Sequence, residues 1–316
     1  MVAEVVTKNI GCENMDDMEL FKLRQKWYSS EEVLYEIVKN LVGRETVFLE
    51  GKIEIPLFTK TGSHVRLIKA HKVEFLKKNF DAYDFYNRPN NIYNSVTYFE
   101  NLPMASFSPT QRKIDQDNFF NGAGFDLCAK KYDLFMDLDS EPLQAKGKME
   151  DEVEAKDVLL KIREYFAIDE MYANAKRLKK VLDDFGLQYS CKFSGLKGMH
   201  FLIKDENIFS KEMKFKDKVE LAKTIATNIK IVEDIPCMDI SIYDQTRLLK
   251  TAYSCEGYLV ALPLSNEQFD NWKIEDMQLD VVMKNIPIRN RGLLERPKTK
   301  DPAEFVKLYG EERLKA

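Results

Sequence analysis

Two aspartates, Asp137 and Asp139, stand two positions apart at the end of the apolar run 132–138. On a β-strand, residues two apart point to the same face, so both carboxylates would lie side by side. Neighbouring carboxylates repel each other unless a cation sits between them, and Mg²⁺ or Mn²⁺ binds to such acids together with substrate phosphates. Two other interpretations remain open: a hydrated strand end, and the DxD site of a sugar-nucleotide transferase.

The segment 194–200 reads SGLKGMH and has the residue types of a phosphate-binding loop. Gly195 and Gly198 would let the backbone approach a ligand and present N–H groups to anionic oxygens. Lys197 adds a cation, and strand alternation places Ser194 and His200 on the face opposite the apolar side chains. A hydroxyl, an imidazole and an ammonium around a glycine loop suit a triphosphate. The alternative is an ordinary tight hairpin with a surface histidine.

A third acid, Asp239, lies in the apolar segment PCMDISI, and the basic segment RLLKTAYS begins at Arg247. Leu248 and Leu249 have the character of core residues, which leaves Arg247 and Lys250 available to a pocket. On the alternative interpretation, Asp239 is a turn residue and the two cations are solvated.

The elements that must position these residues form a mixed α/β pattern. Apolar spacing predicts a sheet with helices on one face, in a catalytic core over 1–264 that is followed by a mostly helical or irregular extension over 265–316. The predicted elements are helices over 15–28 and after Ser29-Ser30, a hairpin over 46–58, a helix over 71–83, a loop-rich stretch over 85–131, a strand over 132–138, two helices of which the second ends at Gly186, a hairpin over 187–204, a helix over 211–233, and strand-like segments over 236–243 and 257–264.

The composition narrows the class of protein. The 316 residues carry a formal net charge of −4, and 13 glycines and 10 prolines exclude collagen-like and linker proteins. The sequence has neither a run of about 18 apolar residues nor a visible secretory signal, so we expect a cytoplasmic protein with no membrane contact. The five cysteines are far apart, which disfavours a disulfide scaffold or a CxxC zinc site.

Two basic stretches, 60–72 and 284–300, are candidates for contact with a nucleic-acid backbone. The alternative for each is a solvated surface strip. Because the whole chain is acidic, we expect it to hold a template weakly by itself, with grip supplied by another domain or subunit.

The three chemistry-bearing segments together resemble, in order, the signatures of the archaeo-eukaryotic primase superfamily. Further similarity lies in Arg44-Glu45 with the strand that follows, in 92–98, and in Phe185-Gly186-Leu187. The similarity covers about 30–262 and is closest to the small catalytic primase subunit. It implies a primase fold in which an RRM-like sheet with flanking helices carries the acids.

The resemblance also implies a function: template-directed nucleotidyl transfer that makes and extends primers on single-stranded DNA. The expected cofactors are two divalent ions, Mg²⁺ or Mn²⁺. The expected partners are the DNA template, NTPs or dNTPs, and an accessory primase subunit or a C-terminal helicase or accessory domain. The implied metal ligands and catalytic residues are Asp137, Asp139 and Asp239, and the implied nucleotide-binding residues are Ser194, Gly195, Lys197, Gly198, His200, Arg247, Lys250 and Arg44.

The sequence departs from the family pattern at three places. It has no zinc knuckle, Leu196 stands where an arginine is frequent, and Glu256 replaces a histidine in the basic segment. These departures favour a primase-polymerase of an archaeal plasmid or virus over a cellular subunit. The alternatives are a primer-dependent repair or end-joining polymerase and a non-catalytic DNA-binding replication protein. The charged helical pattern at the end of the sequence is also compatible with an excised domain.

Overall fold

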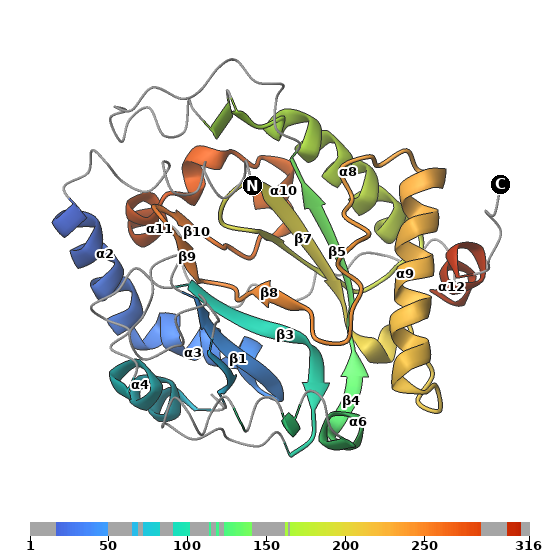
Figure 1. The fold of residues 1–316 in the computed structure, drawn as a ribbon. Coiled ribbons are helices and arrows are strands. Elements are labelled where there is room, and N and C mark those ends of the chain that lie inside the picture. The colour runs from blue at the N-terminus through green and yellow to red at the C-terminus, as the bar shows by residue number, and fades with distance from the viewer. Residues whose placement is uncertain are drawn as a thin grey trace.

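The computed structural model describes residues 17–49, 65–68, 72–82, 91–101, 114, 118–119, 123–140, 162–163, 165–285 and 302–310. In these ranges the chain is a mixed α/β protein, as the sequence predicts, with antiparallel strands at its centre (Figure 1). The predicted basic stretches fall largely outside these ranges, as does the tip of the predicted hairpin over 46–58.

The larger sheet has the strand order β2-β1-β3-β4, and β8 also pairs with β3. Every ladder in the described part is antiparallel, and the strands form separate sheets in place of the single sheet that the sequence predicts. The strands of this sheet are β1 (Arg44–Leu49), β2 (Val65–Ile68), β3 (Asn91–Phe99), β4 (Ala129–Tyr132) and β8 (Leu248–Lys250).

The smaller sheet has the order β5-β7-β6 and contains the Asp137–Asp139 strand and the glycine-loop hairpin. The hairpin predicted over 187–204 is confirmed, because β6 (Ser190–Phe193) and β7 (Gly198–Ile203) pair across the loop. The predicted strand over 132–138 is divided: β4 ends at Tyr132 in one sheet, and β5 (Leu134–Asp139) begins in the other. A short hairpin joins β9 (Cys255–Glu256) and β10 (Leu259–Val260).

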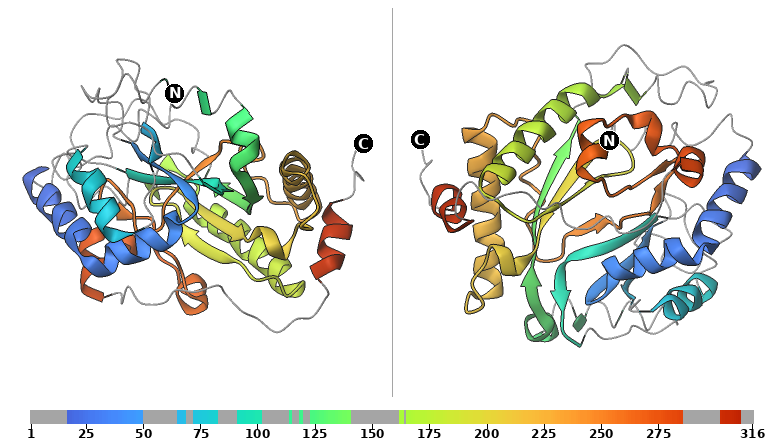
Figure 2. Two further views of the ribbon diagram at one scale, coloured as in Figure 1. Left: turned by 90° about the horizontal axis from the view of Figure 1, so that it is seen from below. Right: turned by 180° about the vertical axis from the view of Figure 1, so that it is seen from behind.

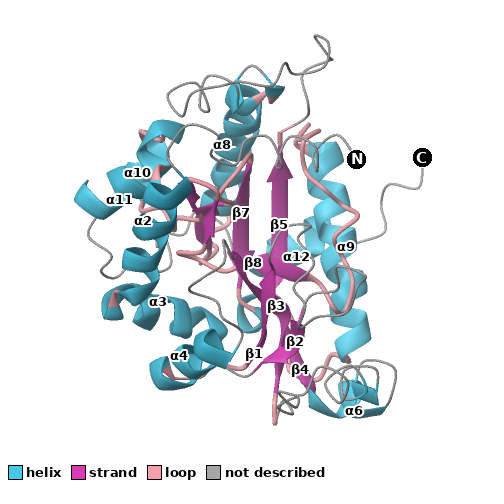
Figure 3. Cartoon of the chain, turned by 60° about the vertical axis from the view of Figure 1, so that its left-hand side comes forward, coloured by secondary structure: helices cyan, strands magenta, loops and turns pink. Residues whose placement is uncertain are grey.

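Helices lie on both sides of the strands rather than on one (Figure 3). In this view α2, α3, α4, α10 and α11 form one group, and α9 lies on the other side of the strands. The helices are α2 (Asp17–Ser29), α3 (Glu31–Leu41), α4 (Val73–Ala82), α6 (Ala123–Cys128), α8 (Ile168–Asp184), α9 (Phe215–Val232), α10 (Asn266–Asp270), α11 (Leu279–Asn285) and α12 (Pro302–Tyr309), with 3₁₀ turns η2 (Asp205–Asn207) and η3 (Ile274–Met277).

The best-predicted helices have local signals for their ends. Ser30 caps α3, where its hydroxyl accepts from the Val33 N–H at 3.5 Å. Helix α8 gives way to Gly186, whose φ of +61° suits glycine better than any other residue. After α11, helix α12 lies beside α9 (Figure 2), with Phe305 packed on Phe185 at 5.5 Å between ring centroids.

Two segments differ in detail from the sequence expectations. The described part of the stretch 85–131, which the sequence predicts to be loop-rich, contains the nine-residue strand β3 as well as α6 and β4. The expected strand over 236–243 is reduced to a bridge between Met238 and Leu138. No helix of the described part is long and apolar enough to cross a bilayer.

Candidate active site

A row of polar side chains crosses the smaller sheet. Asp137 on β5 is paired with His200 on β7, and His200 is paired in turn with Lys192 on β6. Because residues paired across antiparallel strands project to the same face, the carboxylate, imidazole and ammonium lie in one line. Their apolar neighbours Cys191, Phe193, Met199 and Phe201 are buried, as the alternation in the sequence predicts.

Asp137 lies between two cationic or potentially cationic groups. Its Oδ1 is 3.3 Å from His200 Nε2, and its Oδ2 is 3.9 Å from the Arg247 guanidinium. Burial acts to raise the pKa of Asp137, but His200, Arg247 and Lys192 outweigh it and hold that pKa below its usual value. Burial lowers the pKa of His200 despite the nearby Asp137 carboxylate, so the imidazole is neutral at pH 7.

This corner of the site has hydrogen-bonding atoms without partners. Oδ1 of Asp137, Nδ1 of His200 and Nε of Arg247 are buried, and none makes an aligned hydrogen bond. The 3.3 Å approach of His200 to Asp137 is therefore an electrostatic contact without hydrogen-bond geometry. Buried polar atoms are normally satisfied, so three such atoms in one place indicate a surface that a polar ligand would complete.

Asp139 lies at the edge of the site, more exposed than Asp137. Its Oδ2 is 3.1 Å from Lys197 Nζ in the glycine loop. Burial raises the pKa of Asp139, and the charges of Asp137 and Asp239 raise it further, against the lowering effect of Lys197. This mutual repulsion shows that the three acids belong to one electrostatic cluster.

Backbone hydrogen bonds place Asp239 beside β5. Its N–H donates to the Asp137 carbonyl at 2.9 Å, and the Asp139 N–H donates to the Cys237 carbonyl at 3.0 Å. The Oδ1 atom of Asp239 accepts from the Ser241 N–H at 2.8 Å and from its hydroxyl at 2.7 Å. Asp239 is therefore both a neighbour of the other acids and a turn residue.

The acidic cluster fits a divalent cation in its chemistry. Carboxylate oxygens are the ligands that Mg²⁺ and Mn²⁺ prefer, and a cation would relieve the repulsion that raises the pKa of Asp139. No trio of His, Cys, Asp or Glu side chains in the described residues is already arranged around a common metal position. The three acids thus supply suitable donor atoms, although their side chains do not surround one common position.

The glycine loop packs directly against the acids and the basic segment. A Cβ on Gly195, whose φ is +94°, would lie 3.5 Å from Cδ of Lys250, so the loop and β8 are in contact. Within the loop, the Gly198 N–H donates to the Ser194 Oγ at 3.0 Å, which engages one of the N–H groups expected to face a phosphate. The Ser140 hydroxyl and N–H both donate to the Lys197 carbonyl, at 2.6 and 3.2 Å, and fix the loop tip to the end of β5.

A cavity of about 290 Å³ adjoins His200 between the two sheets and helix α3. One of its wall residues, Lys192, is not among those predicted from the sequence, and its amine donates to the Lys250 carbonyl. Alternation along β6 places Lys192 on the face of Ser194, and this was the available signal. The walls also include Arg44, Asn94, Tyr98, Phe135, His200 and Tyr253.

Two lysines beside the acids have strongly perturbed pKa values. Burial lowers the pKa of Lys250 to about 7, against the opposing effect of Cys255, Asp139 and Asp137. Burial also lowers the pKa of Lys192 to about 7, and the charges of Lys250 and Arg44 add to this effect. A phosphate ligand would stabilise the charged form of both amines.

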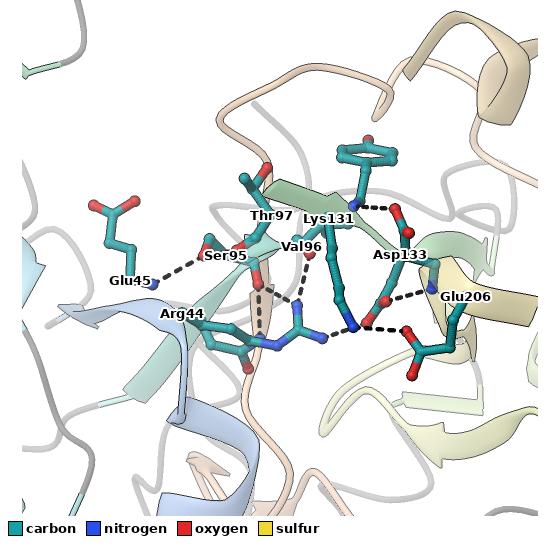
Figure 4. Close-up of polar contacts among 11 residues, drawn as sticks. Arg44, Glu45, Ser95, Val96, Thr97, Lys131, Asp133 and Glu206 are labelled. Carbon is teal, nitrogen blue, oxygen red and sulfur yellow. Dashed lines mark hydrogen bonds and ion pairs between the residues drawn. The ribbon is translucent and has the colours of Figure 1, made fainter. Parts of the chain in front are cut away.

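Arg44 occupies a different position from the other predicted nucleotide-binding residues. It is buried on β1, pairs with Asp133, and donates to the Ser95 and Val96 carbonyls at 2.6 and 2.7 Å (Figure 4). Arg44 lines the cavity, but its guanidinium is already bonded to Asp133 and to the two carbonyls of β3. The side chain of Glu256 lies outside the described residues, and the exposed Lys284 of the basic stretch 284–300 pairs with Asp280 at 3.1 Å.

Comparisons with known proteins leave the family of the chain open. No family model matches the sequence, and no curated protein matches it. Among solved structures, the fold is similar to a polymerase domain of ligase D from Mycobacterium tuberculosis in complex with DNA. The TM-score is 0.44 at 14% sequence identity, over 90% of this chain and 86% of that chain. This likeness is too low to assign a family or an activity.

Proposed function

We propose that the protein is a template-directed nucleotidyltransferase, a DNA primase or primase-polymerase that makes and extends primers on single-stranded DNA. The observation that carries this proposal is the meeting of three separate segments at Asp137. The segments are β5 with its two acids, the glycine-loop hairpin with His200, and the basic segment with Arg247. These are the segments in which the sequence resembles the primase superfamily.

In this proposal Asp137, Asp139 and Asp239 hold the divalent ions, Mg²⁺ or Mn²⁺. When bound, such ions activate a primer 3′-hydroxyl and stabilise the pyrophosphate that leaves the incoming nucleotide. The protein groups around the acids bind and orient the triphosphate. Ser194, Lys197, His200, Arg247 and Lys250 supply hydroxyl, imidazole and cationic groups, and Gly195 and Gly198 keep the loop backbone close to the acids.

His200 acts in this proposal as a hydrogen-bonding phosphate ligand and not as a general acid or base. Burial lowers its pKa, so the ring enters the reaction uncharged. Its Nδ1 is buried without a partner, and a phosphate hydroxyl or a bound water would satisfy it. Lys250 and Lys192 supply positive charge when an anion holds them protonated.

The deciding experiment uses two assays with labelled NTPs and dNTPs and Mg²⁺ or Mn²⁺: one offers unprimed single-stranded DNA, and the other offers the same template with an annealed primer. We expect short products from the wild type and none from a double variant, Asp137→Asn with Asp139→Asn. Asp276→Asn, an exposed acid of η3, is the matched control and retains activity. Extension of a supplied primer without synthesis on unprimed DNA would instead identify a primer-dependent polymerase. Absence of product in both assays, with DNA binding retained, would identify a non-catalytic DNA-binding protein.

The same assays measure the sugar preference, and a separate DNA-binding measurement tests which basic stretch contacts the template. Products labelled from only one nucleotide type assign that type to the site. A basic stretch, 284–300 or 60–72, is assigned to the template when charge reversal at three of its positions weakens DNA affinity and flattens its dependence on salt. An unchanged salt dependence would exclude that stretch as a contact.

A further inference from the structure

Asp133 marks the point where the chain passes from one sheet into the other. Strand β4 ends at Tyr132 in the larger sheet, and β5 begins at Leu134 in the smaller one. Asp133 is 0% exposed. A buried carboxylate is costly unless it is paired, so its partners identify what holds the crossover in place.

One partner comes from the larger sheet. The Arg44 guanidinium of β1 pairs with Oδ2 of Asp133, stacks on the Tyr98 ring at 3.8 Å, and donates to two carbonyls of β3 (Figure 4). Arg44 is itself only 4% exposed. Because the Tyr98 ring and two carbonyls of β3 hold the guanidinium, it can act as a rigid anchor for Asp133.

A second partner comes from the side of α9. Oδ1 of Asp133 accepts from the Asp205 N–H at 2.9 Å. The Asp205 carboxylate accepts from the Tyr132 N–H at 2.8 Å and from Lys218 Nζ at 2.9 and 2.8 Å, and both Asp205 and Lys218 are buried. Two buried ion pairs thus grip successive residues of the crossover, Arg44–Asp133 from one side and Lys218–Asp205 from the other.

This grip lies at the start of the strand that carries the acids. Asp133 directly precedes β5, which carries Asp137 and Asp139. Because an extended strand rises by a fixed distance of about 3.3 Å per residue, we expect a shift at Asp133 to move both acids along with β5. The acids must stay in register with His200 on β7 and with Asp239 on the adjoining segment. The crossover is therefore the place where the position of the acids is set relative to the larger sheet.

We propose that Arg44 and Asp133 are positioning residues, which hold β5 so that its carboxylates face the ligand-binding groups. In this role Arg44 acts through Asp133, and not as the direct phosphate ligand that the sequence resemblance implies. The inference deepens the proposed nucleotidyl transfer and rests on it for its activity readout. Binding of Mn²⁺ in the absence of nucleotide supplies a second readout that does not require turnover.

The test is a double-variant cycle with Arg44→Met, Asp133→Leu and the combined variant. If Arg44 and Asp133 are positioning residues, each single change should lower kcat tenfold or more and weaken Mn²⁺ binding, measured by electron paramagnetic resonance of free Mn²⁺. The nucleotide KM of each single variant should stay within threefold of the wild-type value. The combined variant recovers most of the thermal stability, because it leaves no unpaired buried charge, and its loss of kcat is smaller than the product of the single losses. A direct phosphate ligand predicts instead that Arg44→Met raises KM tenfold while Asp133→Leu leaves it unchanged, which would overturn the proposal.

Two further variants separate positioning from loss of folding. Asp133→Asn keeps the shape of the side chain, and we expect the same weakened Mn²⁺ binding from it. Asp183→Asn breaks the Lys179–Asp183 pair of α8, an ion pair of 2.8 Å with little exposure, and should lower stability while Mn²⁺ binding and kcat stay unchanged. If Asp183→Asn weakens Mn²⁺ binding equally, general destabilisation explains the effect and the proposal fails. If the wild type transfers no nucleotide, the proposed function fails, while the Mn²⁺ comparison still decides between positioning and no positioning.

Discussion

Gly198 leaves the space that the Asp139 carboxylate occupies. The two residues are paired across β7 and β5, and a Cβ built on Gly198 would lie 2.5 Å from Oδ1 of Asp139 and 2.5 Å from the Leu138 carbonyl oxygen. Because Gly198 has no side chain, it leaves room for the Asp139 carboxylate. This role is separate from any contact that the glycine loop makes with a ligand.

Replacing Gly198 by alanine should lower both stability and activity. One of the two contacts is with backbone, so the added methyl group must displace β5 or turn Asp139 away, at a cost of about 1–3 kcal/mol. We expect nucleotidyl transfer to fall about tenfold or more, measured as kcat alongside the melting temperature. Gly124→Ala is the control, because its Cβ would make only an ordinary 3.5 Å contact with Phe119. Full activity of Gly198→Ala would mean that Asp139 is free to move without consequence.

The hydroxyl of Ser140 should tune nucleotide affinity. It joins the end of β5 to the tip of the glycine loop through the Lys197 carbonyl, and its side chain is buried. Loss of one such hydrogen bond is worth about 1 kcal/mol, so Ser140→Ala should raise the nucleotide KM about fivefold. Ser29→Ala removes a comparable hydroxyl-to-carbonyl bond at the exposed end of α2 and should leave KM unchanged. Equal KM values for the two variants would remove the loop tip from nucleotide binding.

Nucleotide affinity should fall as the pH rises above 7. Burial lowers the pKa of Lys250 to about 7 in the free protein, and a bound phosphate would raise it by favouring the ammonium. Binding therefore takes up a proton above pH 7, and KM should rise by up to about tenfold per pH unit. Lys250→Arg keeps its charge throughout this range and should make the profile shallower, leaving the contribution of Lys192, whose pKa burial also lowers to about 7. A profile of KM between pH 7 and 9 that is flat in the wild type would contradict a phosphate role for Lys250.

Removal of the His200 imidazole should act mainly on binding. The ring is neutral because burial lowers its pKa, and its Nδ1 is unpartnered, so its part is to bond a ligand. A hydrogen bond between neutral groups is worth about 0.5–1.5 kcal/mol, so His200→Ala should raise the nucleotide KM about two- to tenfold with kcat largely kept. Steady-state kinetics over a nucleotide titration measures both values. A fall in kcat with KM intact would show that His200 takes part in the chemical step.

Local sequence patterns predict the helices and strands that carry the site. They predict the contacts between these elements less well. Alternation in β6 and β7, the Ser30 cap and the glycine after α8 are local signals, and each is found in the structure. Strand β3 was missed because its polar residues Ser95 and Thr97 resemble loop residues. They are buried, and their partners, the Glu45 N–H and the Gln245 carbonyl, lie far away in sequence.

The site shows the same division. Asp137, His200 and Arg247 were found from their residue types, and the structure brings them together. The alternation along β6 gives the face of Lys192, but its place opposite His200 depends on the pairing of two strands. The Arg44–Asp133 pair joins residues 89 positions apart, and only the packing of the two sheets reveals it.

The row from Lys192 through His200 to Asp137 also limits how the protein can change through evolution. A residue inserted in or deleted from the loop between β6 and β7 would move one strand by one step against the other. Because side chains alternate between faces, that step would place Cys191 or Phe193 in line with His200 and turn the lysine toward the core. Substitutions in this loop can adjust affinity gradually, whereas a change in its length would dismantle the row at once. The number of residues in the loop is therefore a more informative marker of related sites than the identity of its variable positions.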